Sequence, residues 1–193
     1  MIVCKFGGTS VQDAEAMTRV AEIIGARRKK QPVVVASAMG KTTNQLLEAA
    51  QTAVKGKRQE ALDLLTKIKD KHLKEAQKMG IAVTEDWVFE TLHAYFKEMR
   101  DLVKGLSALG ELTPRITDAM ASYGERLSTA ILTQVFENNG IPAQLMDARE
   151  CIITDDNFMR AAPLFDLTDI AIVEHLRPVG VRCKHIYQGS MLF

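Results

Sequence analysis

The stretch IVCKFGGTS, residues 2–10, joins a short β-rich run to the start of a helix through two adjacent glycines. The run 2–6 is typical of a strand, and the glycines end it. Ser10 and Asp13 match the S-x-x-D pattern of a capping box, so we expect a helix capped by Ser10 to follow. Apolar residues then recur on one face at helical spacing: Ala14, Met17, Val20, Ala21 and Ile24.

The next segments predict an α/β fold with a helical insertion. Residues 33–37, VVVAS, form a β-branched run that suits a strand buried on both faces of a parallel sheet. From about 48 to 118, glycine and proline are sparse and helical periods dominate, which indicates a helical insertion. β character returns at 141–148, and residues 166–177 have the pattern of another helix.

Composition narrows the class of protein. The 193 residues suffice for one ordinary domain or a large piece of a bigger one, and the net charge of +1 gives no argument for nucleic-acid binding. No apolar run approaches the roughly twenty residues of a membrane span, and the N-terminus lacks the features of a signal peptide, so we expect a cytoplasmic protein. Three cysteines without a CxxC pair indicate buried free thiols, and no metal-ligand motif is present.

The stretch KFGG is the first candidate for a ligand site. Glycines let a backbone approach a ligand closely, and a helix start offers free N–H groups and the positive end of the helix dipole. Lys5 adds a full positive charge at the end of the strand. The alternative is a tight turn with a surface lysine. The position at the first β–α junction of an α/β sheet favours a phosphate site.

The stretch MGKTTN, residues 39–44, looks like the second half of a phosphate-binding P-loop. The full motif requires a glycine at position 35, where this chain has Val35, so the backbone nest that cradles phosphate is absent. A strand end followed by the hydroxyl-bearing Ser37, Thr42 and Thr43 remains. These residues suit either helix capping or ligand contact.

The stretch SYGERLS, residues 122–128, is the third candidate. It lies on a long predicted helix, where four polar residues form one line opposite the apolar stripe: Asp118, Ser122, Glu125 and Thr129. This pattern alone favours a solvated face. Glu125 could equally be a carboxylate that receives a substrate ammonium, and periodicity does not decide between the two.

Taken in this order, KFGGTS, SAMGKTTN and SYGERLS resemble aspartokinase, of the amino acid kinase family. The blocks LSALGELTPRITDAMASYGERLS and DARECIITDDNF add to a resemblance that runs from residue 1 to about 175. It implies an amino acid kinase-like α/β fold, with a parallel-rich sheet, flanking helices and the helical insertion. It also implies ATP-dependent phosphorylation of the side-chain carboxylate of L-aspartate, the first step toward lysine, threonine and methionine.

The resemblance also implies roles for individual residues. The ATP-binding stretch would comprise Lys5, Gly7, Gly8, Thr9 and Ser10. Lys5 would be catalytic, because its charge would neutralise the charge that builds on the transferred phosphoryl group. Thr43 and Glu125 match the aspartate-binding positions, with Ser37 a weaker match, and Glu125 would pair with the substrate ammonium. Mg²⁺ would accompany ATP without a protein ligand that we can name, and a homo-oligomer is possible.

The chain departs from the family pattern at its C-terminal end. Family members continue with a G-R-G-G-S-D segment, whose arginine and aspartate complete aspartate binding and catalysis, and this segment is absent. We therefore expect residues 1–178 to be the N-terminal part of the kinase domain, and 179–193 to be a tail that packs less well. The chain alone is expected to be inactive. The alternative is a non-catalytic remnant that binds aspartate or pairs with a kinase subunit.

Overall fold

A four-stranded parallel sheet forms one half of the molecule in the computed structural model, which describes residues 1–82, 87–176 and 186–189. The strand order is β1-β2-β4-β3, and every pairing is parallel. The strands are β1 (Ile2–Phe6), β2 (Pro32–Ala36), β3 (Leu145–Asp147) and β4 (Ile186–Gly189). The predicted α/β class with a parallel sheet is confirmed.

The register brings the carboxyl ends of the strands to one edge of the sheet. Lys5 lies opposite Val35, and Asp147 lies opposite Gly189. All five residues of β2 are buried, as the run of β-branched side chains predicts for a strand covered on both faces. Because ligands of α/β proteins bind at the carboxyl edge, the loops after β1 and β2 are the first place to search for a site.

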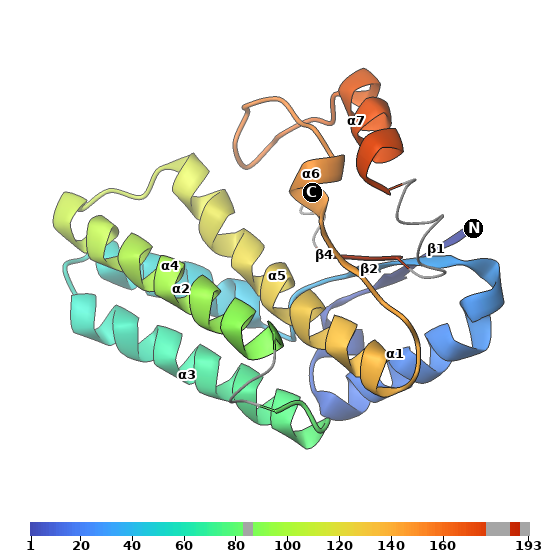
Figure 1. The fold of residues 1–193 in the computed structure, drawn as a ribbon. Helices are drawn as coiled ribbons and strands as arrows, with labels where there is room; N and C mark the ends of the chain where they lie inside the picture. Colours follow the sequence, from blue (N-terminus) through green and yellow to red (C-terminus); the bar gives the residue numbers. More distant parts are fainter. Residues whose placement is uncertain (83–86, 177–185, 190–193) are drawn as a thin grey trace.

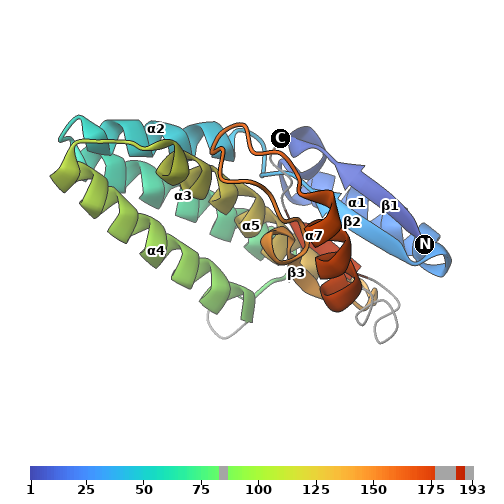
Figure 2. The ribbon, with the colours of Figure 1, turned by 90° about the horizontal axis from the view of Figure 1, so that it is seen from above.

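Helices α2, α3 and α4 form the other half of the molecule, whereas α1, α6 and α7 lie on the side of the sheet (Figures 1 and 2). In Figure 2, α2, α3 and α4 gather on the side away from β1 and α1, and α5 extends between the two halves. Accordingly, α5 packs on α2 and α4 as well as on α1 and the strands. The helices are α1 (Ala14–Arg27), α2 (Thr42–Val54), α3 (Arg58–Lys78), α4 (Trp87–Leu109), α5 (Pro114–Asn138), α6 (Ala148–Cys151) and α7 (Phe165–Ala171), and a π-helical turn (Ile172–Leu176) continues α7.

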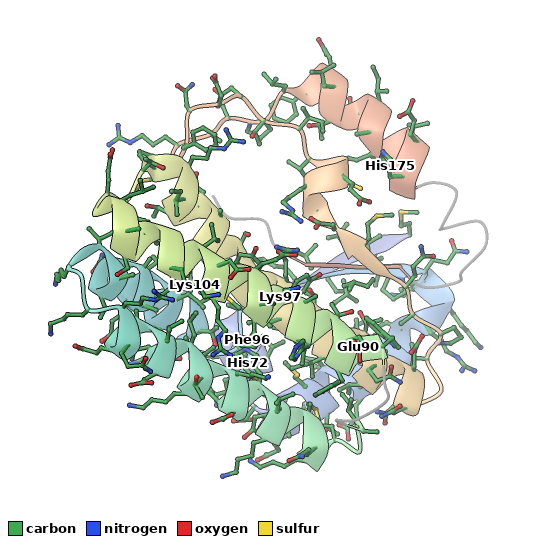
Figure 3. The ribbon with its side chains drawn as sticks, turned by 60° about the vertical axis from the view of Figure 1, so that its left-hand side comes forward. His72, Glu90, Phe96, Lys97, Lys104 and His175 are labelled. Atoms are coloured by element: carbon green, nitrogen blue, oxygen red, sulfur yellow. The ribbon has the colours of Figure 1, made fainter. Side chains whose placement is uncertain are left out.

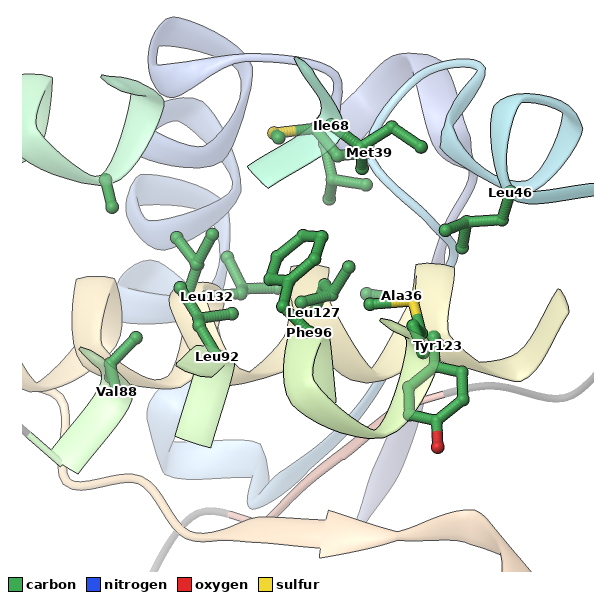
Figure 4. Close-up of a cluster of buried hydrophobic side chains, with 14 of the residues drawn as sticks. Ala36, Met39, Leu46, Ile68, Val88, Leu92, Phe96, Tyr123, Leu127 and Leu132 are labelled. Carbon is green, nitrogen blue, oxygen red and sulfur yellow. The ribbon is translucent and has the colours of Figure 1, made fainter. Parts of the chain in front are cut away.

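One large apolar core joins the sheet and the helices (Figure 4). The apolar stripes predicted from sequence supply it: Leu65 and Ile68 of α3, Leu92 and Phe96 of α4, and Leu127 of α5 are buried. Met39, from the loop after β2, is fully buried in the same cluster. That loop is therefore fixed by the core rather than free at the surface.

The start of α1 differs from the prediction. The helix begins at Ala14, and its cap is Asp13, whose Oδ1 accepts a hydrogen bond from the Ala16 N–H at 2.9 Å. Ser10 instead lies in a 3-10 turn, Gly8–Val11, and its N–H donates to the Gly7 carbonyl at 2.9 Å. The predicted capping box is wrong because the backbone makes this extra turn before the helix starts.

The segment expected to be a tail is described only in part. Its four residues Ile186–Gly189 form β4, whose backbone pairs with β2 and β3 inside the sheet. Their backbone is thus integrated in the sheet, although we expected residues from 179 onward to pack less well. The remainder of 179–193 lies outside the described residues, and the boundary at 178 stays a prediction.

Two expectations about the chemistry of the chain can be compared with the structure. Cys4 and Cys151 carry free thiols, as predicted, and Cys151 is buried, but Cys4 is only half-buried, so the predicted burial is wrong for Cys4. Cys183 lies outside the described residues. Within the described ranges, no helix is both long enough and apolar enough to cross a membrane.

Candidate functional site

Two loops lie side by side at the carboxyl edge of the sheet. The loop after β1 contains Gly7 and Gly8, and the loop after β2 contains Ser37 and Gly40. The Ser37 N–H donates to the Phe6 carbonyl at 3.0 Å, and the Gly40 N–H donates to the Gly8 carbonyl at 3.1 Å. These hydrogen bonds extend the pairing of β1 and β2, so KFGG and MGKTTN belong to one site.

The two predicted phosphate-binding glycines differ in their surroundings. A Cβ at Gly8 would lie 3.1 Å from the carbonyl oxygens of both Ala38 and Gly40, so Gly8 lets the loops touch. Around Gly7, in contrast, no described atom lies within 4 Å of the position that a Cβ would take. Gly7 therefore leaves room for a ligand to approach the backbone, whereas Gly8 is required by the packing of the protein itself.

The remaining residues of the predicted ATP-binding stretch are accessible. Lys5, Thr9 and Ser10 are exposed. At the start of α1, two N–H groups already have acceptors, because Asp13 accepts from Ala16 and the Glu75 carboxylate accepts from the Ala14 N–H at 3.0 Å. These two groups are therefore not available to a phosphate, and the expected contribution of the helix start stays a prediction.

Glu75 is a residue that the sequence analysis missed. It lies on α3 and also receives a 2.7 Å hydrogen bond from Lys78. Burial by itself would raise the pKa of Glu75, but the hydrogen bonds from Lys78 and Ala14 hold this pKa below its ordinary value. An ionised carboxylate therefore occupies the positive end of the α1 dipole. From sequence, Glu75 is one charged residue among many on a predicted helix, and nothing indicated that it would contact the start of α1.

The polar line predicted on α5 is not a solvated face. Glu125 and Thr129 are each only 4% exposed, while Asp118 and Ser122 are half-buried. The solvated interpretation fails because α5 lies between the helices and the sheet, so that both of its sides are covered. The buried hydroxyl groups satisfy their hydrogen bonding on the helix backbone, as Thr129 does by donating to the Glu125 carbonyl at 2.7 Å.

Among the described residues, no cation forms an ion pair with the buried carboxylate of Glu125. Burial raises its pKa, and the nearby backbone of Glu125 itself and of Ala38 opposes this shift in part. Among the described residues, none provides a hydrogen bond to its Oε2 atom. An unpartnered buried carboxylate oxygen is costly to the fold, and such a group is a candidate for function.

Arg126, next to Glu125 in sequence, does not neutralise it. Its guanidinium carbon lies 4.0 Å from the ring centroid of Tyr95 and 4.6 Å from that of Tyr123. The Tyr123 hydroxyl in turn donates to Glu98 at 2.6 Å. Burial, followed by the hydrogen bond to Glu98, raises the pKa of Tyr123 to about 12. Arg126 is thus engaged by aromatic rings, and Glu125 remains available for an external cation.

The loop after β2 lies against α5 beside Glu125. A Cβ at Gly124 would lie 2.9 Å from the Ala38 Cβ and 3.0 Å from Oγ1 of Thr43. The Ser128 hydroxyl donates to the Ser37 carbonyl at 2.7 Å. The structure therefore brings together the three residues that the resemblance assigned to the aspartate side, Ser37, Thr43 and Glu125.

Some residues of this arrangement were missed from sequence. Gly124 lies in the middle of a long helix, where glycine is unfavourable, and this was an available signal of close approach. Ser128 carried no such signal. Lys41 is exposed. The Thr42 hydroxyl donates to the Met39 carbonyl at 2.7 Å, so Thr43 is the neighbouring hydroxyl that can meet a ligand. Within the described ranges, no group of three His, Cys, Asp or Glu residues could hold a metal ion.

Comparison with known proteins identifies the family to which the chain belongs. The family model described as the amino acid kinase family matches residues 1–178. This chain belongs to the amino acid kinase family. It is 38% identical over 162 residues to aspartokinase 2, chloroplastic, of Arabidopsis thaliana, covering 82% of this chain and 29% of that protein. It is 30% identical over 181 residues to lysine-sensitive aspartokinase 3 of Escherichia coli K12, covering 91% and 36%.

A solved structure gives the same result for the fold. E. coli aspartokinase III in complex with aspartate and ADP superimposes with a TM-score of 0.82, at 28% identity, over 98% of this chain and 40% of that chain. The chain thus spans well under half the length of these relatives. The parallel sheet and the helices that support the candidate site are an amino acid kinase fold.

Proposed function

We propose that this chain carries the aspartate site and part of the ATP site of an aspartate kinase. The reaction is transfer of a phosphoryl group from ATP to the side-chain carboxylate of L-aspartate, which gives 4-phospho-L-aspartate. The observation that carries the proposal is Glu125, a buried carboxylate with an oxygen that no described residue bonds, lying beside the loop after β2. The relatives named above are aspartokinases, which supports the same substrate.

On the aspartate side, Glu125 pairs with the substrate ammonium. The site around it has a low effective dielectric constant, so a charge-assisted hydrogen bond there is stronger than one in water. Thr43 and Ser37 approach α5 from the loop after β2 and supply polar contacts next to this pair. A free amino group close to the carboxylate that accepts the phosphoryl group is a feature of aspartate itself.

On the nucleotide side, Lys5, Gly7, Gly8, Thr9 and Ser10 contact the phosphates of ATP. The accessible backbone at Gly7 and the exposed ammonium of Lys5 support this assignment. Lys5 neutralises charge on the phosphoryl group during transfer. The contact between Gly8 and Gly40 joins the loop for ATP to the loop for aspartate, which suits transfer between two bound substrates.

Mg²⁺ is proposed only as a companion of ATP. The described residues offer no cluster of metal ligands, and Mg²⁺ in kinases is commonly bound through substrate phosphates and water. The finer parts of the proposal are a role in lysine, threonine and methionine synthesis, a cytoplasmic location and a possible homo-oligomer. The division into a kinase part, 1–178, an insertion near 48–118 and a tail, 179–193, belongs to the same proposal.

Aspartate binding by the 193-residue chain tests the proposal. In titration calorimetry, Glu125→Gln is expected to weaken aspartate binding by roughly 10- to 100-fold, because a hydrogen bond between charged groups contributes about 1.5–3 kcal/mol. Glu48→Gln is the matched control, since Glu48 is an exposed carboxylate on α2. The proposal fails if the chain binds no aspartate, or if Glu125→Gln binds it as the unmodified chain does.

A hydroxamate assay with aspartate and ATP on the same samples tests the expectation that the chain alone is inactive. Product formation would contradict the expectation that the chain alone is inactive. Aspartate binding without product is the behaviour expected of a binding-only remnant or of a kinase whose remaining segments are required for turnover. Adding ATP to the aspartate titration then tests whether the two loops bind their ligands together.

A further inference from the structure

Ser128 makes a contact that its position in the helix does not require. Its side chain is fully buried, and its hydroxyl donates to the carbonyl of Ser37 at 2.7 Å, 91 residues away in sequence. The same hydroxyl has a second acceptor on its own helix, the Glu125 carbonyl at 3.0 Å. The neighbouring helical hydroxyls of Thr129 and Thr133 donate to carbonyls of α5. Ser128 is therefore a cross-link between α5 and the loop after β2.

The cross-link fixes the residues that surround Glu125. Ser37 is followed by Ala38, whose backbone lies close enough to the Glu125 carboxylate to lower its pKa in part. One turn before Ser128, Gly124 lets Ala38 and Thr43 approach closer than any side chain would permit. The loop is thus attached to α5 at Ser37 and packed on it at Ala38 and Thr43. Both contacts involve the residues adjacent to the proposed ammonium-binding carboxylate.

We propose that Ser128 is a positioning residue for the amino acid substrate. Its hydroxyl holds the Ser37 carbonyl, so that Ala38 and Thr43 stay packed against α5 beside Glu125. Without this bond, the loop gains freedom to move away from α5 and from the Glu125 carboxylate. This inference rests on the proposed function for the identity of the substrate, but the geometry that it describes can be tested without one.

The first experiment measures aspartate binding by calorimetry for two buried hydroxyl deletions on α5. Thr133 is 2% exposed, and its Oγ1 donates at 2.8 Å to the Thr129 carbonyl one turn away. Ser128→Ala is expected to weaken aspartate binding about five- to tenfold, as the loss of one positioning hydrogen bond predicts, and Thr133→Ala is expected to leave binding unchanged. Urea unfolding of both variants checks that they lose comparable stability.

The second experiment requires no ligand. It follows the amide proton resonance of Ala38 by NMR when Glu125→Gln removes the charge of the neighbouring carboxylate. This substitution is expected to shift the resonance in the unmodified chain and in the Thr133→Ala background. In the Ser128→Ala background, the same substitution is expected to change it much less, because Ala38 no longer remains beside residue 125.

The outcomes separate the inference from the function. An equal response of Ala38 in the Ser128→Ala and Thr133→Ala backgrounds overturns the positioning role, and so does equal aspartate affinity in these two variants. If the chain binds no aspartate at all, but only the Ser128→Ala background uncouples Ala38 from residue 125, the proposed function fails and the positioning role stands. If Ser128→Ala does not fold, Ser128→Cys keeps a weak donor and is measured in the same two ways.

Discussion

Four side-chain atoms are buried without a hydrogen bond from any described residue, and two of them, in different regions, are instructive to compare. In the helical half, the atom is Nε2 of His72 on α3, and at the sheet edge it is Oε2 of Glu125 on α5, while the other two are Arg126 Nε and Gln134 Oε1. Figure 3 shows His72 beside Phe96, whose ring lies edge-on at a centroid distance of 6.4 Å. Burial favours the neutral form of both groups, so it lowers the pKa of His72 and raises the pKa of Glu125.

The surroundings of the two groups differ, and this difference distinguishes a packed core from a binding site. His72 lies in an apolar core, and its Nδ1 already contacts the Ile68 carbonyl at 2.7 Å. Glu125 lies beside a loop with hydroxyl groups, at the edge of the sheet where ligands of α/β proteins bind. We therefore interpret the missing hydrogen bond as a cost to stability at His72 and propose that it serves recognition at Glu125.

The largest expected effect is the pH dependence of stability due to His72. Its pKa falls from 6.5 to about 4, chiefly through burial, so the unfolded chain binds a proton more readily than the folded one. Stability is then complete above pH 6.5 and declines as the pH falls toward 4, by up to about 3 kcal/mol. Urea unfolding at pH values across this interval measures the effect.

His72→Leu is expected to remove most of this pH dependence, and His93→Leu, at an exposed position on α4, is the control. Neither substitution is expected to alter aspartate binding. A change in aspartate affinity with His72→Leu would contradict the assignment of His72 to the core alone, because it would connect the buried histidine to the candidate site.

The second effect is the pH dependence of aspartate binding due to Glu125. Burial places its pKa above that of an ordinary glutamate, and the substrate ammonium pairs only with the ionised form. Aspartate binding is therefore expected to weaken as the pH falls through this raised pKa, approaching about tenfold per pH unit below it. Calorimetry between about pH 5 and 8 follows the change. In Glu125→Gln, the remaining weak binding is expected to be nearly independent of pH over this range.

The smallest effect compares a helical glycine in each region. Gly124→Ala places a Cβ against Ala38 and Thr43, and it is expected to cost about 1–3 kcal/mol of stability and to weaken aspartate binding. Gly105→Ala, on α4, meets no described atom within 4 Å and is expected to add about 0.5–1 kcal/mol. Thermal unfolding of both variants tests this, and equal stability changes would contradict the close approach at Gly124.

Much of the fold could be predicted from local pattern. The β-branched run of β2 and the apolar stripes on α3, α4 and α5 indicated their own burial, because periodicity reports which faces must leave water. The start of α1 could not be predicted in the same way. Ser10 and Asp13 both had the chemistry of a cap, and the extra 3-10 turn that selects Asp13 depends on the packing of the loop.

For the candidate site, too, some features could be predicted from the sequence and others could not. The sequence by itself determined which groups are available: Lys5 and two glycines after the first strand, the hydroxyls after the second, and Glu125 on a long helix. Only the tertiary structure decided that Glu125 is buried rather than solvated, because α5 is covered on one side by helices and on the other by the sheet. It also decided that Glu75 occupies the start of α1 and that Ser128 reaches Ser37, since these contacts join residues 61 and 91 positions apart, a separation over which periodicity carries no information.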